Sequence, residues 1–320
     1  MDLSSPRFIL FGFVVIVLNY LLSAKYRTAF LLFFSFLFIG YYSLMSAVAV
    51  LFLSVVNYAV SHRINRILYR SSILFNVVVV LLCGYIGQNS QGVSFTISDL
   101  SFNVEKVVII LGVSFYTLQN IGYLINVYNR RVLPAKSLPS FILANSFFPK
   151  VLSGPIEDIS TFSKQLDNID VSSQDLVIGL NRVVIGLFKK LVLADRLNYA
   201  VSAVFDTGIT YNGVTTIVGA YLFTIQLYFD FSAYTDIAIG IARMLGLRMS
   251  ENFNKPFRSL SISEFWRRWH ITLVNWLTNF LFYPIVFRFR KQKIVATYIG
   301  VAATFIISSI ITIIFGILFF

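Results

Sequence analysis

Two polar clusters interrupt the apolar sequence, and each contains residue types that can do chemistry. In the first, Gln226–Asp236, the carboxylates of Asp230 and Asp236 come directly after a charge-free stretch, residues 207–229. An ionised Asp near the centre of a bilayer costs roughly 2.5–3.5 kcal/mol on insertion scales, so such a group usually faces a protein interior or an aqueous cavity. The alternative is that both carboxylates lie at the interface and cap helix starts, which suits Asp236 because an apolar run follows it.

The second cluster, Ser263–His270, ends in a histidine that begins an otherwise apolar span. A neutral imidazole at that position can act as a general base, a proton relay or a hydrogen-bonded structural group. Spacing alone favours the structural role for His270, because polar residues without a motif usually just pack.

The remaining residues of this cluster have a structural interpretation. Glu264 and Arg268 are four residues apart and can pair on one helix face, and Ser261 or Ser263 can cap that helix. Trp266 and Trp269 are of the type that anchors a helix at a membrane interface.

Composition indicates the elements that must position these clusters. The chain of 320 residues is 57% hydrophobic and 12% charged, whereas an ordinary soluble domain has about 25% charged residues. This excludes a soluble enzyme, a disordered tail and a disulfide scaffold. The single cysteine, Cys83, allows no disulfide within the chain and no Cys/His metal site. The net charge of +12 comes from short basic clusters between apolar runs, as in cytoplasmic loops facing anionic lipid, so nucleic acid is not expected as a partner.

The fold class predicted is all-α, a polytopic membrane protein with about eight to ten membrane segments. We expect a span at 8–24, a hairpin of two spans within the charge-free run 28–61, and spans at 71–88 and 107–129. With these spans, the three basic loops near Arg27, Arg66 and Arg130 all fall on one side, which the positive-inside rule assigns to the cytoplasm.

The second half of the chain is less regular. The run Phe141–Leu152 is interrupted by Pro149, Gly154 and Pro155, and predicts a re-entrant or interfacial segment within 137–168, whose polar backbone groups protein or water must satisfy. Residues 176–194 contain Arg182, Lys189 and Lys190 and predict a tilted or partly buried helix. Further apolar stretches are residues 207–229, 269–287 and 294–320.

Several blocks, in order between residues 105 and 285, resemble the membrane-bound O-acyltransferase family, in its bacterial branch that modifies alginate and teichoic acids. Gln226–Gly240 resembles one of its motifs, Glu251–Phe257 is similar to its ENFNxPY turn, and Ser263–His270 is similar to its TEFWRRWH block. Three more segments resemble family blocks: Gly112–Gln119, Phe147–Ile156 and Gly186–Asp195.

This resemblance implies two regions, the N-terminal transmembrane helices at 1–104 and a family core at 105–320. It implies a multi-pass protein of the cell membrane that passes an acyl group through a tunnel to an extracytoplasmic polysaccharide or acyl-accepting protein. The donor would be acetyl-CoA or another cytoplasmic acyl thioester, and no bound cofactor or metal is expected. His270 would be catalytic, and the residues expected to bind substrate are Gln226, Asp230, Ser232, Tyr234, Asp236, Asn252, Trp266 and Arg267.

The chain departs from the family at a second histidine, which the resemblance places in a later span. Thr312 stands at that position, and no histidine follows His270. A threonine cannot act as a general base near neutral pH, so we expect a truncated, frameshifted or degenerate member without detectable transfer. A non-catalytic membrane scaffold or conduit for a cell-envelope polysaccharide system remains the alternative. A secondary transporter is a third interpretation, although no inverted repeat is visible.

Overall fold

The computed structural model describes residues 5–88, 93–97, 100–104, 112–205 and 211–316, and helices dominate it, which confirms the predicted fold class. In chain order the helices are α1 (Pro6–Leu21), α2 (Ala24–Tyr42), α3 (Leu44–His62), α4 (Arg66–Gln88), α5 (Val113–Tyr128), α6 (Leu138–Ser146), α7 (Ile159–Leu166), α8 (Ser173–Phe188), α9 (Asp195–Phe205), α10 (Gly213–Met244), α11 (Ile262–Arg268), α12 (Ile271–Leu277), α13 (Tyr283–Arg288) and α14 (Lys293–Gly316). Two π-helical segments, η1 (Lys189–Ala194) and η3 (Thr278–Phe282), and one 3₁₀ turn, η2 (Pro256–Arg258), connect some of them.

A short antiparallel hairpin, β1 (Val93–Ile97) with β2 (Leu100–Val104), is an element that the sequence did not predict. It falls between the predicted spans at 71–88 and 107–129. The predicted boundary between the two regions, at residues 104 and 105, borders residues 105–111, which lie outside the described residues.

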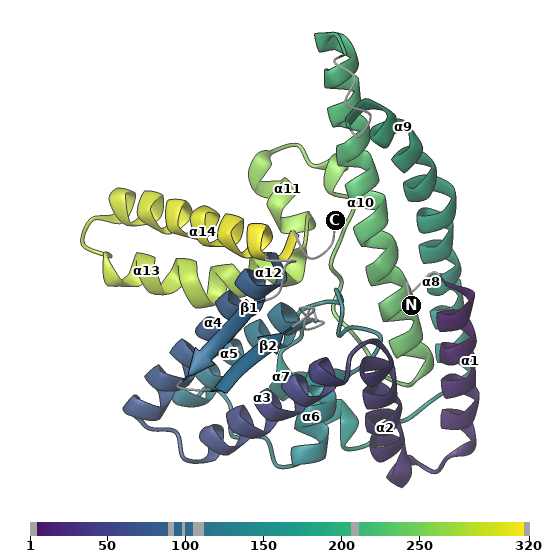
Figure 1. Cartoon of the computed structure of the whole chain (residues 1–320), viewed down its shortest axis with the longest axis vertical. Helices are drawn as coiled ribbons and strands as arrows, with labels where there is room; N and C mark the ends of the chain where they lie inside the picture. The colour runs from purple at the N-terminus through teal and green to yellow at the C-terminus, as the bar shows by residue number, and fades with distance from the viewer. Residues whose placement is uncertain (1–4, 89–92, 98–99, 105–111, 206–210, 317–320) are drawn as a thin grey trace.

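The long helix α10 runs between α8 and α9, which lie on its outer side, and the rest of the molecule (Figure 1). Helices α13 and α14 lie side by side and extend away from α10. Helices α3, α4, α5 and α6 lie together in the lower part of the view. The run 28–61, where a hairpin of two spans was predicted, forms two helices, α2 and α3, that meet at Ser43. The Ser43 Oγ accepts a hydrogen bond from the Ser46 amide at 3.1 Å and so caps α3. Of the two helices, α3 is a candidate span.

Three described helices are long and apolar enough to cross a membrane: Leu44–His62, Arg66–Cys83 and Gly213–Met244. A fourth candidate is the pair Ile262–Arg268 and Ile271–Arg288, which is bent by 109°. The shorter apolar helices Pro6–Leu21 and Ile294–Ile310 fall below that length. The described residues therefore form a bundle of apolar helices, and the count of eight to ten membrane segments stays a prediction.

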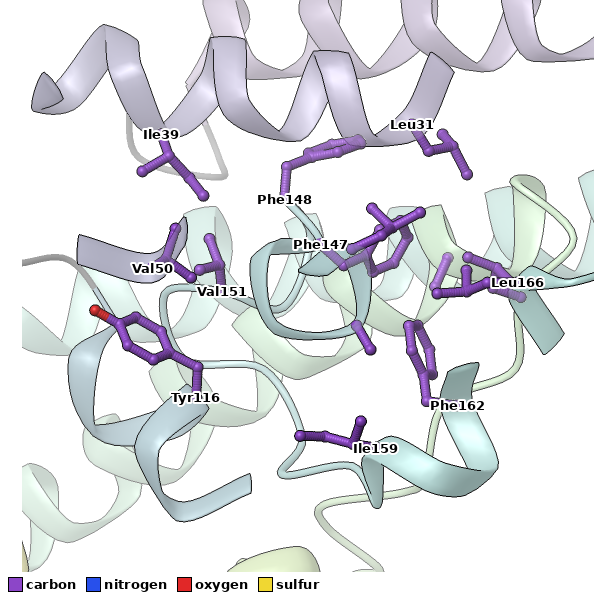
Figure 2. Packing of buried hydrophobic residues seen from close by; sticks show 14 of the residues in the cluster. Leu31, Ile39, Val50, Tyr116, Phe147, Phe148, Val151, Ile159, Phe162 and Leu166 are labelled. Atoms are coloured by element: carbon purple, nitrogen blue, oxygen red, sulfur yellow. The ribbon is translucent and has the colours of Figure 1, made fainter. Parts of the chain in front are cut away.

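The predicted re-entrant stretch consists of the short helices α6 and α7 joined by a buried turn. Phe147 and Phe148 in this turn have no exposed surface. Figure 2 shows Phe148 directed towards the helix that carries Leu31 and Ile39, and Phe147 on the side of Phe162. The Phe147 and Phe162 rings lie 5.6 Å apart, centroid to centroid. Protein on several sides therefore encloses the irregular backbone, as the sequence required.

Candidate functional site

His270 lies at a sharp break between α11 and α12. It adopts the left-handed conformation, with φ 42° and ψ 54°. This conformation is uncommon for a residue other than glycine, and it persists only where the surroundings hold it. The predicted start of α11 is confirmed, since Ser261 Oγ accepts from the Glu264 amide at 3.2 Å. The predicted pair of Glu264 and Arg268 is also formed, at 2.6 Å.

Residues 252–254 hold the chain on both sides of the break. On the N-terminal side, the Asn254 amide donates to the Arg268 carbonyl at 2.9 Å. On the C-terminal side, the Ile271 amide donates to the Asn252 carbonyl at 2.9 Å, and Asn252 Oδ1 accepts from the Thr272 hydroxyl at 2.8 Å. Asn252 is completely buried. It was expected to bind substrate, and the structure engages its carbonyl and Oδ1 with the turn after His270.

The ring of His270 lies among aromatic side chains. Its centroid is 4.9 Å from that of Phe231 and 6.4 Å from that of Phe253. Its Nδ1 is buried and has no hydrogen-bond partner among the described residues. A buried polar atom without a partner usually costs free energy. A neutral imidazole nitrogen without a partner can accept a proton from a hydroxyl group that comes within hydrogen-bond distance of it.

A cavity of about 490 Å³ opens beside this turn. Phe253, which packs against His270, and Ile271, the residue after it, both line the cavity. The cavity is rich in charge, and its other lining residues are Arg182, Ile185, Lys189, Tyr228, Thr235, Asp236, Glu251, Asn254 and Lys255. The break at His270 is therefore next to a space that a polar substrate can enter.

Asp236 is the predicted substrate-binding residue that lines this cavity, and its carboxylate is held by two cations. Oδ1 lies 2.6 Å from Arg182 Nε, and Oδ2 lies 2.6 Å from Lys189 Nζ. Arg182 also reaches Glu251 Oε2 at 2.5 Å. The capping interpretation of Asp236 was wrong, because α10 continues without interruption from Gly213 to Met244. The two cations compensate the carboxylate inside the helix.

Close packing of α8 on α10 allows Arg182 and Lys189 to contact Asp236. A Cβ atom at Gly186 would lie 2.7 Å from Ile237 Cγ1 and 2.9 Å from the Ala233 carbonyl oxygen. Glycines in such positions let helix backbones approach each other closely within a membrane. The approach brings the side chains of α8 and η1 onto α10.

Two other predicted substrate-binding residues of α10 pair with its neighbours outside the cavity. Asp230 Oδ1 accepts from Lys190 Nζ at 2.6 Å, and its side chain is 45% exposed. Gln226 Nε2 donates to Asn198 Oδ1 at 2.9 Å. These two residues therefore connect α10 to η1 and α9.

Ser232 and Tyr234 also face protein. Ser232 is buried and donates to the Phe229 carbonyl of its own helix at 3.4 Å. The Tyr234 hydroxyl accepts from the Ser153 amide at 3.1 Å and donates to the Pro149 carbonyl at 3.3 Å. Tyr234 thus connects the turn between α6 and α7 to α10.

Trp266 and Arg267 lie on α11, away from the residues that line the cavity. Trp266 packs edge to face against Phe305 of α14, with the ring centroids 5.5 Å apart, and Arg267 is exposed. Their place supports the structural interpretation of the two side chains.

Sequence reasoning missed most of the cavity lining. Arg182 and Lys189 were noticed as charges in an apolar helix but were not assigned to the site, although a cation inside such a helix implies an acidic partner. Glu251, Lys255 and Thr272 were not singled out as site residues, and nothing in their local spacing indicates their role. No cluster of three His, Cys, Asp or Glu side chains suited to a metal occurs among the described residues.

Comparison with known proteins gives one consistent result. The profile of the membrane-bound O-acyltransferase family matches residues 31–311. The probable alginate O-acetylase AlgI of Pseudomonas aeruginosa is 34% identical over 296 residues, 87% of this chain. The teichoic acid D-alanyltransferase of Bacillus subtilis is 31% identical over 199 residues, which are 59% of this chain and 49% of that protein. The peptidoglycan O-acetyltransferase of Helicobacter pylori is 33% identical over 221 residues, 61% of this chain and 42% of that protein. The chain spans 56–61% of the length of four alginate O-acetylases that it matches.

Proposed function

Since this chain belongs to the membrane-bound O-acyltransferase family, we propose that it serves acyl transfer across the cell membrane, as a multi-pass protein. The donor is a cytoplasmic acyl thioester, with acetyl-CoA as the first candidate. The acceptor is an extracytoplasmic polysaccharide or an acyl-accepting protein. The names of the relatives, which include alginate, peptidoglycan and teichoic acid enzymes, support an acceptor of the cell envelope.

The observation that carries this proposal is the unpaired, buried Nδ1 of His270 at the helix break. In the proposed step an acceptor hydroxyl attacks the carbonyl carbon of the thioester. The carbon–oxygen bond forms, the carbon–sulfur bond breaks, and the thiolate leaves. His270 Nδ1 takes the proton of the hydroxyl, a contribution that is typically 10²–10⁴-fold for a positioned base.

The charged cavity has the chemistry to hold the polar part of the donor. Arg182, Lys189 and Lys255 line it, against the carboxylates of Asp236 and Glu251. Cations of this kind bind phosphate groups, which a coenzyme A thioester carries. We therefore place the donor's phosphates in the cavity and its thioester towards the turn of Phe253 and His270.

Thr312 favours a second candidate function, a non-catalytic scaffold or conduit. Its backbone lies in α14, and its side chain is outside the described residues. If the second family histidine is needed for transfer, threonine at this position blocks the reaction because its hydroxyl is not a base near neutral pH. We propose that transfer by the 320 residues is below detection for this reason.

One experiment separates the two functions. Membranes that contain the chain, or its Thr312→His variant, are supplied with labelled acetyl-CoA and cell-surface glycan, and label on the glycan is counted. We expect no label above empty membranes for the chain and measurable label for Thr312→His. Absence of label with both, although both bind acetyl-CoA, would favour the scaffold or conduit.

A further inference from the structure

Thr272, two residues after His270, joins three separate segments of the chain through one hydroxyl group. The hydroxyl donates to Asn252 Oδ1 at 2.8 Å and accepts from the Ile156 amide at 3.0 Å. The backbone amide of Thr272 also points to Asn252 Oδ1, at 3.3 Å. The end of the re-entrant stretch, the turn at 252 and the start of α12 therefore meet at this side chain.

The junction is buried, so water does not replace these bonds. Thr272 is 6% exposed, Ile156 is 8% exposed and Asn252 is 0% exposed. A hydroxyl lost here would leave the buried Ile156 amide without its partner, and Asn252 Oδ1 would keep only the longer bond from the Thr272 amide, at 3.3 Å. Leaving such groups unpaired costs more than an average hydrogen bond contributes.

The junction at Thr272 is two residues from His270, whose backbone conformation is strained. His270 is in the left-handed region at φ 42°, and the amides of the next two residues, Ile271 and Thr272, both bond to Asn252. A strained backbone conformation persists only while its surroundings over-determine it. The side chain of Thr272 supplies the link that fixes Asn252 and, through it, the turn.

We propose that Thr272 is a positioning residue for His270. Thr272 holds the imidazole of His270 at the helix break and does not itself touch substrate. The assignment of a reaction to His270 rests on the proposed function, whereas the positioning itself can be measured without any reaction. The alternative is that the Thr272 hydroxyl merely stabilises the fold. In that case the Thr272→Val variant would unfold more easily, with no selective change at His270.

The chain offers a clean probe because it contains two histidines, His62 and His270. In a His62→Gln background, carbethoxylation by diethyl pyrocarbonate, followed by its absorbance, reports His270 alone. The rate is measured on detergent-purified chain with threonine, serine or valine at position 272. A matched control is Thr278→Val, because the Thr278 hydroxyl, at the start of η3, donates to the Val274 carbonyl of the preceding turn at 2.7 Å and to no other group among the described residues.

We expect Thr272→Val to raise the carbethoxylation rate roughly tenfold, since two buried bonds of the turn are lost and local opening becomes more frequent. Thr272→Ser keeps the hydroxyl and should stay within about twofold of the parent, as should Thr278→Val. An unchanged rate in folded Thr272→Val would overturn the proposal. An equal increase in Thr278→Val would also overturn it, because the effect would then be general loosening. If Thr272→Val does not fold, Thr272→Ala takes its place, with the same expected and contradicting results.

The transfer assay in the Thr312→His background distinguishes this proposal from the proposed function. Positioning predicts that Thr272→Val lowers kcat and leaves the KM for acetyl-CoA unchanged, because the donor's phosphates bind elsewhere. A raised KM with unchanged kcat would overturn the positioning role. If Thr272→Val exposes His270 while His270→Ala leaves transfer intact, the positioning stands and the catalytic role of His270 falls.

Discussion

Arg182 on α8 and Asp236 on α10 form an ion pair, with 2.6 Å between Nε and Oδ1. The same carboxylate receives Lys189 at 2.6 Å, and the same guanidinium receives Glu251 at 2.5 Å. The Asp236 side chain is only 6% exposed. Two cations and two carboxylates thus connect α8, α10 and the segment that supports the turn at His270.

Asp236→Asn should destabilise the fold, because it leaves Arg182 and Lys189 without their shared carboxylate. Breaking a buried pair costs about 3–5 kcal/mol, and the partial exposure of the two cations, 32% and 22%, reduces this to about 2 kcal/mol. Thermal unfolding in detergent, followed by circular dichroism, measures the change. Asp230→Asn is the matched control. Its side chain is 45% exposed, so the loss should stay below about 1 kcal/mol. Equal losses in the two variants would contradict the central place of Asp236.

Gly186→Ala should loosen the contact between α8 and α10. The added methyl group would meet Ile237 and the Ala233 carbonyl at less than 3 Å, and overpacking of this kind typically costs about 1–3 kcal/mol. At Gly40, in α2, a Cβ meets nothing within 4 Å. Gly40→Ala should therefore raise the unfolding temperature slightly, because alanine favours a helix over glycine by about 1 kcal/mol. A stabilising Gly186→Ala would disprove the close packing.

The stability of the fold should rise with pH above 8, through Lys150. This residue lies in the turn between α6 and α7, outside the candidate spans. Burial lowers the pKa of Lys150 to about 8, against which Glu157 raises it. The unfolded chain has the ordinary pKa and binds the proton up to pH ~10.5. Between these values the unfolded state holds more protons, so the free energy of unfolding increases with pH, by up to about 3 kcal/mol.

Unfolding temperatures in detergent between pH 8 and pH 10 check this dependence. Lys150→Met removes the titrating group, whose Nζ lies 4.6 Å from the Phe162 ring centroid, so the unfolding temperature of this variant should lack the rise. A rise of the same size in Lys150→Met would assign the dependence to other groups.

The basic loops should be reachable from the cytoplasm. Tyr69 and Tyr128 stack with their ring centroids 4.1 Å apart, and the Tyr58 hydroxyl donates to the Lys136 carbonyl at 3.2 Å, so two of these loops lie together. In a Cys83→Ser background, Ile67→Cys and Leu133→Cys place thiols at positions that are 79% and 85% exposed. An impermeant reagent should label both from the cytoplasmic side only, because arginines resist translocation. Labelling from outside would reverse the topology.

Features that depend on neighbouring residues could be predicted from the sequence. The break between two helices at Ser43 follows from a charge-free run that is too long for one span. The start of α11 at Ser261 and the pair of Glu264 with Arg268 follow from spacing along one helix, and both are present. The resemblance to the acyltransferase family also rested on local blocks, and the family match confirms it.

Features that depend on contacts between distant segments could not be predicted. A capping role was one alternative for Asp236, because an apolar run follows it. It was wrong, since α8 packs closely enough for two cations to neutralise the carboxylate within a continuous helix. The bonds that the carbonyl and Oδ1 of Asn252 accept from the turn after His270 were not predicted, and substrate binding by Asn252 stays a prediction. Both sets of contacts depend on how distant segments pack, which local spacing does not record.

The most direct test of the account is the dependence of acyl transfer on His270. Label transferred from acetyl-CoA to glycan is measured for the Thr312→His chain with and without His270→Ala, and His62→Gln is the control at the other histidine. We expect His270→Ala to lower the rate by about 10²–10⁴-fold, and His62→Gln to leave it unchanged because His62 is exposed at the end of α3. Transfer that survives His270→Ala at the rate of the parent would contradict the account.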